Sequence, residues 1–252
     1  MLFDLRGKRK RAVQVVYASL AVIFLVGFVG FSIGSGNAPG GLLDAIGLGG
    51  GSGSSGSLST QFDDQINATN ARLAKNPKDT QALSKLALYE YLKGKQGVTQ
   101  DPTTGQTSVS SDAHTELGKS ADAWTKYLRL NKGKPNVSIA AQVVNSFIFI
   151  GDASGAAKTE EIVAKDQPSQ NSYGTLAIYR YIAGDFAGGD GAAKKAENLA
   201  VGVQKKQVKT QLAGVRAQAV KLKKQQQKAA KNAPPPTAPG ANPLGGLGGQ
   251  TP

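Results

Sequence analysis

His114 is the only histidine of the 252-residue chain and the first side chain to consider for catalysis. It lies in the run SDAHTE at 111–116, which has the composition of a helix N-terminus. A catalytic histidine needs a nucleophile or a metal ion beside it, and the sequence offers neither motif. One histidine cannot form a multi-histidine zinc site, and the lack of cysteine excludes disulfides, thiolate metal sites and cysteine nucleophiles. We therefore expect no catalytic residue, no cofactor and no metal site.

Paired carboxylates are the other side chains that could act as acid, base or metal ligand. Glu160 is adjacent to Glu161, and Asp185 is close to Asp190. On amphipathic helices and at turns such pairs usually lie on solvated faces, so a glycosidase or metal role is not expected. The chain also lacks phosphate-loop, dinucleotide-binding and serine-elbow patterns. The sequence therefore predicts that the protein is not an enzyme.

Aromatic side chains favour a role in binding. The candidates for contacting a partner are Tyr173, Tyr179, Arg180 and Tyr181. Two other aromatic pairs, Trp124 with Tyr127 and Tyr89 with Tyr91, are more typical of packing between helices. We expect the partner to be a protein or a peptide.

The formal net charge of +13 comes from the two ends of the chain. Residues 1–11 contain five basic residues and one acidic residue, whereas residues 203–231 contain nine basic residues and no acidic one. The stretch between them, 12–202, is balanced, with 16 basic and 16 acidic residues. Because the excess charge is confined to the ends, we do not expect nucleic acid to be the partner.

Residues 12–34 predict a transmembrane helix. They form 23 consecutive uncharged residues, and a helix of that length, at about 1.5 Å per residue, spans the ~30 Å hydrocarbon core of a bilayer. Five cations precede the segment and would orient it: Arg6, Lys8, Arg9, Lys10 and Arg11. No further cation occurs before Arg72, so the positive-inside rule places the N-terminus in the cytoplasm and the remainder outside.

The alternative to an anchor is a cleaved signal peptide. Its apolar region would run only about 7 to 15 residues, and the nearest small-residue site, 36–38, is followed by Pro39. We therefore expect an uncleaved single-pass anchor in the cytoplasmic membrane, after a basic cytoplasmic segment at 1–11. A Gly/Ser-rich linker at 35–57 would lead to a folded domain at 58–231, and the Pro/Gly-rich tail at 232–252 is expected to be disordered.

Helices are expected throughout 58–231, because apolar residues recur there at intervals of three and four without a strand pattern. Phe62, Ile66 and Leu73 share one face of the first helix, and Thr60 with Asp63 predicts a capping box at its start. Further helices are expected at 79–93, 113–131, 137–150, 153–165, 171–183, 190–200 and 201–231. The predicted fold class is all-α.

A period of about 33 residues, a length typical of stacked helical hairpins, indicates that these helices form a repeat. Gly151 and Gly184 recur at this interval, each followed by aspartate, and Pro135 and Pro168 precede them by equal distances. In such hairpins a proline typically precedes the first helix and a glycine lies in the turn between the two helices. Upstream, the equivalent proline is Pro77, and its distance from Pro135 exceeds one period. The excess coincides with a polar run, so 96–111 is predicted to be a loop inserted in one repeat.

The pattern resembles the tetratricopeptide repeat (TPR) family over roughly residues 62–200. The best matches are Asn76-Pro77-Lys78-Asp79 with Leu83 and Leu86, then Ala123, Tyr127 and Pro135, and in the next repeat Ala156 and Pro168. Two positions depart from the family pattern, because Glu160 replaces a large apolar residue and Gly174 replaces an aromatic one. The resemblance implies a TPR-like α-helical solenoid that binds peptides on its concave face.

The last predicted helix, 201–231, has one apolar stripe on a cationic surface. The stripe consists of Val201, Val208, Val215 and Leu222 at every seventh residue, with Leu212 and Ala219 between them. Three roles are compatible with it: a cap on the last repeat, a short coiled-coil dimer, or a helix that binds a polyanion. For the polyanion role the candidate residues are Lys205, Lys209 and Lys224. The oligomeric state is not predicted.

The architecture as a whole resembles the membrane-anchored TPR proteins that accompany the bacterial protein-export channel and its chaperones. That resemblance implies an interaction module outside the cytoplasmic membrane, which binds an extended peptide or partner protein and assists export or envelope assembly. The alternative is a structural tether, whose basic last helix binds anionic lipid or an envelope polymer. Salt separates the two, because only polymer or lipid binding should fall steeply with ionic strength.

Overall fold

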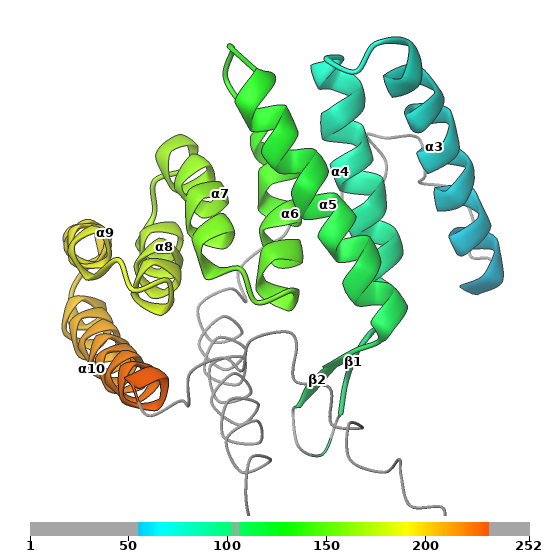
Figure 1. Ribbon diagram of the computed structural model, residues 1–252. Coiled ribbons are helices and arrows are strands. Elements are labelled where there is room, and N and C mark those ends of the chain that lie inside the picture. Colours follow the sequence, from blue (N-terminus) through cyan, green and yellow to red (C-terminus); the bar gives the residue numbers. More distant parts are fainter. Residues whose placement is uncertain (1–54, 102, 104–105, 232–252) are drawn as a thin grey trace, which may run out of the picture.

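The computed structural model describes residues 55–231, except 102, 104 and 105 (Figure 1). The helices are α3 (Ser55–Lys75), α4 (Thr80–Lys95), α5 (Ser111–Leu130), α6 (Val137–Phe149), α7 (Ala153–Asp166), α8 (Gln170–Ile182), α9 (Phe186–Leu199) and α10 (Val203–Lys231). Two short strands, β1 (Val98–Gln100) and β2 (Thr107–Val109), lie between α4 and α5. The predicted all-α class is confirmed for this part of the chain. The predicted segments 1–11, 12–34 and 232–252, and the linker before residue 55, lie outside the described residues.

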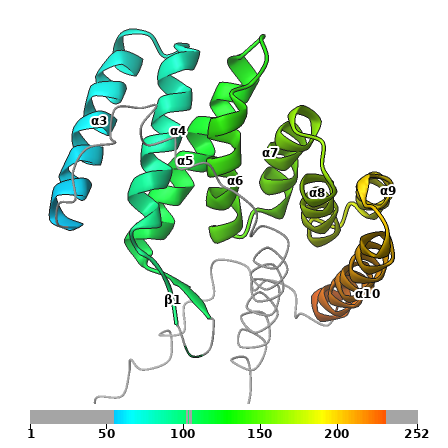
Figure 2. The same cartoon turned by 180° about the vertical axis from the view of Figure 1, so that it is seen from behind.

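Three helical hairpins form the body of the molecule: α4 with α5, α6 with α7, and α8 with α9. Each hairpin packs on the next, because α5 contacts α6 and α7 contacts α8. The helix α3 packs on α4 at one end of the stack, and α10 packs on α8 and α9 at the other (Figures 1 and 2). This arrangement agrees with the helical repeat that the sequence period predicts.

The repeated glycines form identical turns between the two helices of a hairpin. Gly151 and Gly184 have φ of +80° and +82°, the left-handed conformation that glycine adopts without steric cost. At both turns the glycine N–H donates to the carbonyl three positions before it, and the next N–H donates to the carbonyl five positions before it. This is the Schellman arrangement of a helix C-terminus. The side chains of Asp152 and Asp185 then cap α7 and α9 by accepting the N–H of the residue three positions later.

The prolines lie in the connections that precede the first helix of each hairpin. Each is followed by a residue whose side chain caps that helix, namely Asp79 for α4, Asn136 for α6 and Ser169 for α8. A proline here removes a backbone donor outside the helix and disfavours helical backbone just before it. The boundaries of the hairpins are therefore set by local sequence.

Buried polar contacts join the hairpins through an otherwise apolar core. Trp124 is fully buried, and its Nε1–H donates to Thr159 Oγ1 at 3.2 Å, which connects α5 with α7. Ser146 donates to Ser120 Oγ at 2.9 Å, and Ser120 donates to the carbonyl oxygen of Ala87 at 2.7 Å. These bonds satisfy the two buried hydroxyls, so α4, α5 and α6 can pack closely around them.

The predicted starts of two helices, α3 and α9, lie several residues from those in the structure. The helix α3 begins at Ser55, so the capping box predicted at Thr60 and Asp63 is wrong: Thr60 lies inside the helix, where an N-cap cannot form. Residues 55–57, predicted as the end of the linker, are also helical. The helix α9 begins at Phe186 instead of 190, because Asp185 caps it there.

The insertion predicted as a loop at 96–111 contains the two paired strands β1 and β2, and its last residue, Ser111, begins α5. Strands β1 and β2 are antiparallel, with Val98 opposite Val109 and Gln100 opposite Thr107. Beyond the strands, the Ser110 N–H donates to the Gly97 carbonyl at 3.0 Å. Such short strands cannot show an alternating pattern, which is why sequence periodicity missed them.

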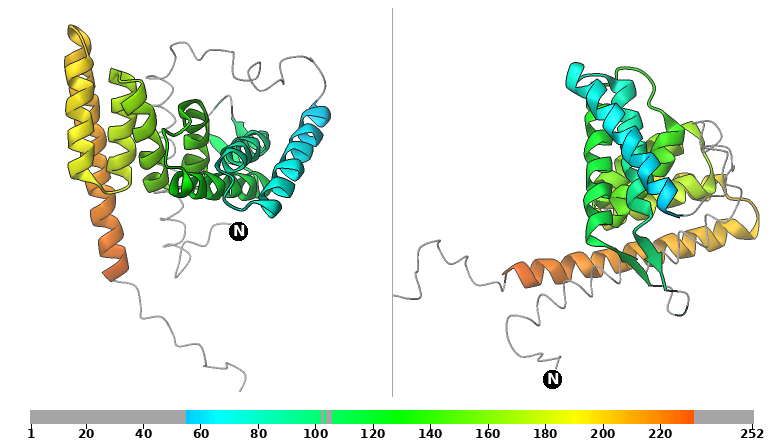
Figure 3. Two further views of the ribbon diagram at one scale, coloured as in Figure 1. Left: turned by 90° about the horizontal axis from the view of Figure 1, so that it is seen from above. Right: turned by 90° about the vertical axis from the view of Figure 1, so that its right-hand side faces the viewer.

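The helix α10 covers the third hairpin along the predicted apolar stripe. Val208, Leu212, Val215 and Ala219 are buried, whereas Val201 is 74% exposed because it precedes the helix and is not part of the stripe. The C-terminal part of α10 extends beyond α8 and α9 (Figure 3). An end of the stack that would otherwise expose apolar surface is thus covered.

Candidate binding groove

A groove of about 610 Å³ lies at the N-terminal end of the stack, between α3, α4 and α5. Its apolar lining comes from all three helices: Ile66 and Leu73 of α3, Leu83 and Leu86 of α4, and Ala123 of α5. On each helix the lining residues recur mainly at intervals of three or four, which places them on one face. An open groove where apolar side chains meet charged groups is a candidate ligand site.

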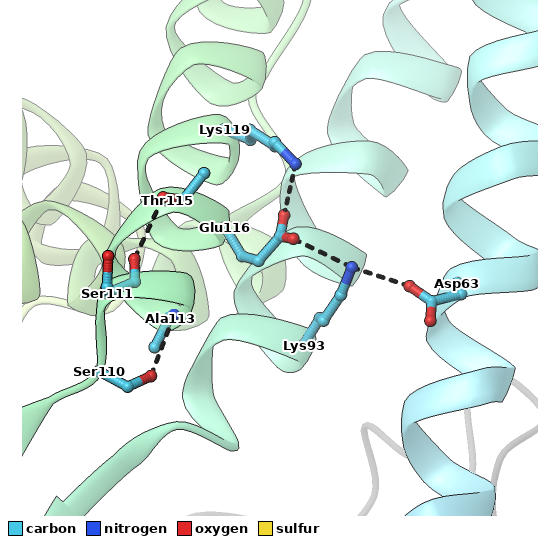
Figure 4. Close-up of polar contacts among 8 residues, drawn as sticks. All are labelled: Asp63, Lys93, Ser110, Ser111, Ala113, Thr115, Glu116 and Lys119. Carbon is cyan, nitrogen blue, oxygen red and sulfur yellow. Dashed lines mark hydrogen bonds and ion pairs between the residues drawn. The ribbon is translucent and has the colours of Figure 1, made fainter.

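Ion pairs link the three helices across one end of the groove (Figure 4). Lys93 of α4 reaches Asp63 Oδ1 of α3 at 2.8 Å and Glu116 Oε1 of α5 at 3.0 Å. Lys119 pairs with the other oxygen of Glu116 at 2.9 Å. Hydrogen bonds to Asp63 and Glu116 raise the pKa of Lys93 above its usual range, so this bridge stays charged at neutral pH.

Glu90 lies in the groove beside this bridge and is nearly inaccessible, with 3% of its surface exposed. Its Oε2 atom has no hydrogen-bond partner among the described residues. Burial, followed by the hydrogen bond and like charge of Glu116, raises the pKa of Glu90 to about 7. Burial also acts to raise the pKa of Glu116, but hydrogen bonds from Lys119, Glu90 and Lys93 outweigh it and lower the pKa to about 2. The two carboxyls therefore lose their protons at well-separated pH values, Glu116 in acid and Glu90 near neutral pH.

Two carboxyls with separated pKa values can serve as the acid and base of an enzyme, and their partners here define what this pair can contact. Both oxygens of Glu116 are engaged by lysines, and Glu90 also forms a hydrogen bond with this carboxylate. No group of three or more histidine or carboxylate side chains in the described part of the chain could hold a metal ion. The groove offers an apolar surface and one buried carboxyl whose Oε2 atom has no hydrogen-bond partner among the described residues.

The sequence candidates for partner binding lie elsewhere, on α8. Tyr179 and Tyr181 are buried in the core, and the Tyr181 hydroxyl donates to Asp190 Oδ1 at 2.9 Å. Tyr173 is half-buried, with the Lys195 ammonium 5.0 Å from its ring centroid. Arg180 is ion-paired with a carboxylate of α7. The structure therefore does not gather these four residues into one accessible surface.

The other sequence candidates either lie on the surface of α10 or fall outside the described residues. Lys205, Lys209 and Lys224 are exposed on α10 and form no ion pair within the described part. The membrane-orienting Arg6, Lys8, Arg9, Lys10 and Arg11 lie outside it. Among the helices that the structure describes, none has the length and apolar character needed to cross a bilayer.

The remaining residues singled out for chemistry have packing or surface roles. His114 is exposed in the first turn of α5, which Ser110 caps. The rings of Trp124 and Tyr127 pack with their centroids 4.9 Å apart, and Tyr89 and Tyr91 are buried. Glu161 is ion-paired with Arg180, and Asp190 with Arg216. Glu160 is buried on α7, and burial raises its pKa to about 8.

Sequence reasoning missed the groove residues Glu90, Lys93 and Glu116. One local signal was available for Glu90, which interrupts the apolar run at 86–92 between two tyrosines. A charged residue at a core-facing position is rarely buried unless it has a role in structure or binding. Lys93 and Glu116 carried no such signal, because their pairing depends on how three helices meet.

Comparison with known proteins does not assign the chain to a family. No protein-family model matches the chain, and no curated protein or solved structure matches it significantly. The functional argument therefore rests on the residues and geometry described above.

Proposed function

We propose that this chain is a non-enzymatic interaction protein whose TPR-like domain binds an extended segment of a partner protein. The observation that carries the proposal is the groove between α3, α4 and α5, where an apolar surface is joined to an ion-paired rim. Main features of the TPR resemblance support it, including the stacked hairpins and the turns that recur once per period. A bound segment would bury apolar side chains against the half-buried Leu73 and Leu86 and keep its polar backbone toward the ion pairs at the end of the groove.

The proposal includes a membrane anchor at 12–34, with the N-terminus in the cytoplasm and the repeats outside. Its support is the uncharged length of that segment and the five cations before it. A module held at the outer face of the cytoplasmic membrane could meet proteins as they are exported or assembled in the envelope. The partner is then a protein or peptide, and no nucleic acid or cofactor is required.

Site-specific photo-crosslinking in intact membranes tests the groove. A photoreactive phenylalanine derivative would replace Asn70, an exposed α3 residue that lines the groove, or Lys158, an exposed α7 residue outside it. We expect a discrete crosslinked partner from position 70 and none from position 158, identified by mass spectrometry. Equal crosslinking at both positions, or none at either, would refute binding in the groove.

The second candidate function is a tether that binds anionic lipid or polymer through α10. Its specific support is the charge of that helix, which has nine basic residues and no acidic one, with Lys205, Lys209 and Lys224 exposed. Co-sedimentation of the full chain, in detergent, with a polyanion such as polyglutamate measures this activity. The tether predicts strong binding that falls steeply from about 50 to about 300 mM salt, whereas the groove predicts no such binding.

A further inference from the structure

The same position in the three hairpins carries three chemically different side chains. Glu90, Phe147 and Arg180 each lie on the first helix of a hairpin, eleven positions after the residue that caps that helix, namely Asp79, Asn136 or Ser169. Glu90 lines the groove between α3, α4 and α5, whereas Arg180 contacts α7 and α9 and Phe147 contacts α7. The contacts at the second and third positions show how these two side chains are satisfied.

Arg180 and Phe147 are satisfied by contacts from within the chain. The guanidinium of Arg180 donates to Glu161 Oε2 of α7 at 2.7 Å and to the Gly188 carbonyl of α9 at 3.0 Å. Phe147 is buried against Gly155 of α7, where a β-carbon would clash with its ring. The third position thus holds a cation bound to a carboxylate, and the second holds a buried aromatic ring.

At the first position the charge is reversed, because the side chain is a carboxyl. Glu90 is 3% exposed, lines the groove and has an Oε2 atom without a hydrogen-bond partner among the described residues. A buried acceptor without a donor is rare, because losing water without gaining a hydrogen bond is unfavourable. We propose that the groove recognises an arginine or lysine side chain of the bound peptide, whose cationic group pairs with Glu90; this inference rests on the proposed function.

The charges facing Glu90 favour a cation over an anion. Asp63 comes from α3, Lys93 from α4, and the remaining groups, Glu116, Lys119, Asp122 and Lys126, from α5. With Glu90 ionised, the groove has four carboxylates and three ammonium groups, so one added cation balances it. Lys93 and Lys119 form their ion pairs with Glu116 and Asp63, so their charges act on Glu90 without a direct ion pair to it among the described groups.

Cation binding must then be coupled to the proton on Glu90. Burial raises the pKa of Glu90 to about 7, and a bound cation would lower it again by stabilising the carboxylate. The ligand therefore displaces the proton, and affinity should rise with pH from about 6 to 8. Glu116 and Lys93 do not titrate in this range, because their pKa values are shifted away from it.

Two peptides that differ only in charge test the inference on the full chain in detergent micelles. The probes are fluorescein-labelled Gly-Leu-Arg-Leu-Gly amide and its citrulline counterpart, a neutral isostere with similar shape, and the readout is fluorescence anisotropy between pH 6 and 8. We expect the arginine peptide to bind about tenfold more tightly at pH 8, as a charge-assisted hydrogen bond predicts, and its advantage to shrink at pH 6. Equal affinities for the two peptides, or no binding of either, would overturn the inference.

Matched variants separate binding from a structural effect. Glu90→Gln should abolish both the arginine preference and its pH dependence, while circular dichroism shows whether the helices are intact. Glu160→Gln, at the other buried glutamate outside the groove, should leave the preference unchanged. If Glu90→Gln retains the preference, the cation binds elsewhere and the inference fails. Crosslinking of a partner at position 70, together with equal affinity for the two peptides, would support the proposed function. It would refute only the inference that Glu90 recognises a cation.

Discussion

Gly151 and Gly184 lie one repeat period apart and hold the same left-handed turn, and each is followed by an aspartate that caps the next helix. The two turns also share both backbone hydrogen bonds of the Schellman motif. One sequence device therefore reverses the chain twice in the same way. Because the successive hairpins contain equivalent turns, they stack in register.

Replacing the turn glycine should destabilise the domain through backbone conformation alone. No atom lies within 4 Å of a β-carbon at Gly151, so Gly151→Ala would introduce strain at positive φ without a clash. We expect a loss of about 1–2 kcal/mol in the free energy of unfolding, measured by urea denaturation. Gly191→Ala, in the interior of α9 with equally open surroundings, should instead be neutral or stabilise by up to about 1 kcal/mol. Similar effects of the two variants would contradict the argument from φ.

The buried stripe of α10 should be far more sensitive than its lysine face. Val208→Asp or Val215→Asp would place an unpaired charge on the surface that packs on α8 and α9, costing on the order of several kcal/mol. Replacing Lys205, Lys209 and Lys224 together with Gln should change stability little, because they are exposed. Chemical denaturation of each variant at moderate salt measures the contrast. Neutral valine variants together with lost polyanion binding by the lysine variant would favour the tether.

Two adjacent glutamates on α7 should respond to pH with opposite signs. Burial raises the pKa of Glu160 to about 8, so its ionisation destabilises the fold increasingly as pH rises from about 4.5 to 8. Hydrogen bonding to Lys165 and the charge of Arg180 lower the pKa of Glu161, so Glu161 stabilises the fold above about pH 4.5, and this contribution is lost in acid.

At pH 8 we therefore expect Glu160→Gln to be more stable than the wild type by a few kcal/mol, and Glu161→Gln to be slightly less stable. At pH 4 the difference between Glu160→Gln and the wild type should nearly vanish. Thermal denaturation across this pH range provides the measurement. A Glu160→Gln variant that is less stable than the wild type at pH 8 would show that the carboxylate has a stabilising partner.

The β-hairpin between α4 and α5 should contribute little to stability. Replacing residues 99–108 with a short Gly/Ser connection removes mainly exposed residues and shortens a loop, so the unfolding free energy should change by less than about 1 kcal/mol. Ser110→Ala should cost about 1 kcal/mol on its own, because Ser110 caps α5. Denaturant midpoints of the two variants can be compared directly. A loss of several kcal/mol on removing the hairpin would show that it packs against the repeats.

The membrane topology has a direct chemical test. A cysteine can be introduced without a competing thiol, since the chain has none. With the N-terminus inside, Ser52→Cys should react with a membrane-impermeant thiol reagent in intact cells, and Phe3→Cys only after lysis. Labelling of Phe3→Cys in intact cells, with Ser52→Cys protected, would reverse the orientation.

Local sequence determined the repeat. Pro135, Pro168 and the two Gly-Asp pairs mark hairpin starts and turns because their backbone preferences act within a few residues of the chain. The stripe of Val208 and Val215 likewise identified the buried face of α10, since a helix places residues seven apart on one side. Where such signals were weak, at the start of α3 and in the short strands β1 and β2, the sequence prediction was wrong.

Tertiary structure alone decided which side chains form the groove. Asp63, Lys93 and Glu116 belong to three helices, and only the packing angle of α3 and α5 on α4 brings their charges within 3.0 Å. The same packing leaves Glu90 buried with an unpartnered oxygen, although Arg180 at the equivalent place is satisfied by Glu161. Tyr179 and Tyr181, which sequence chemistry marked for binding, are instead buried on α8, which packs against α9 and α10. Helical periodicity fixes a residue's direction on its own helix, but its neighbours depend on the packing of helices distant in sequence.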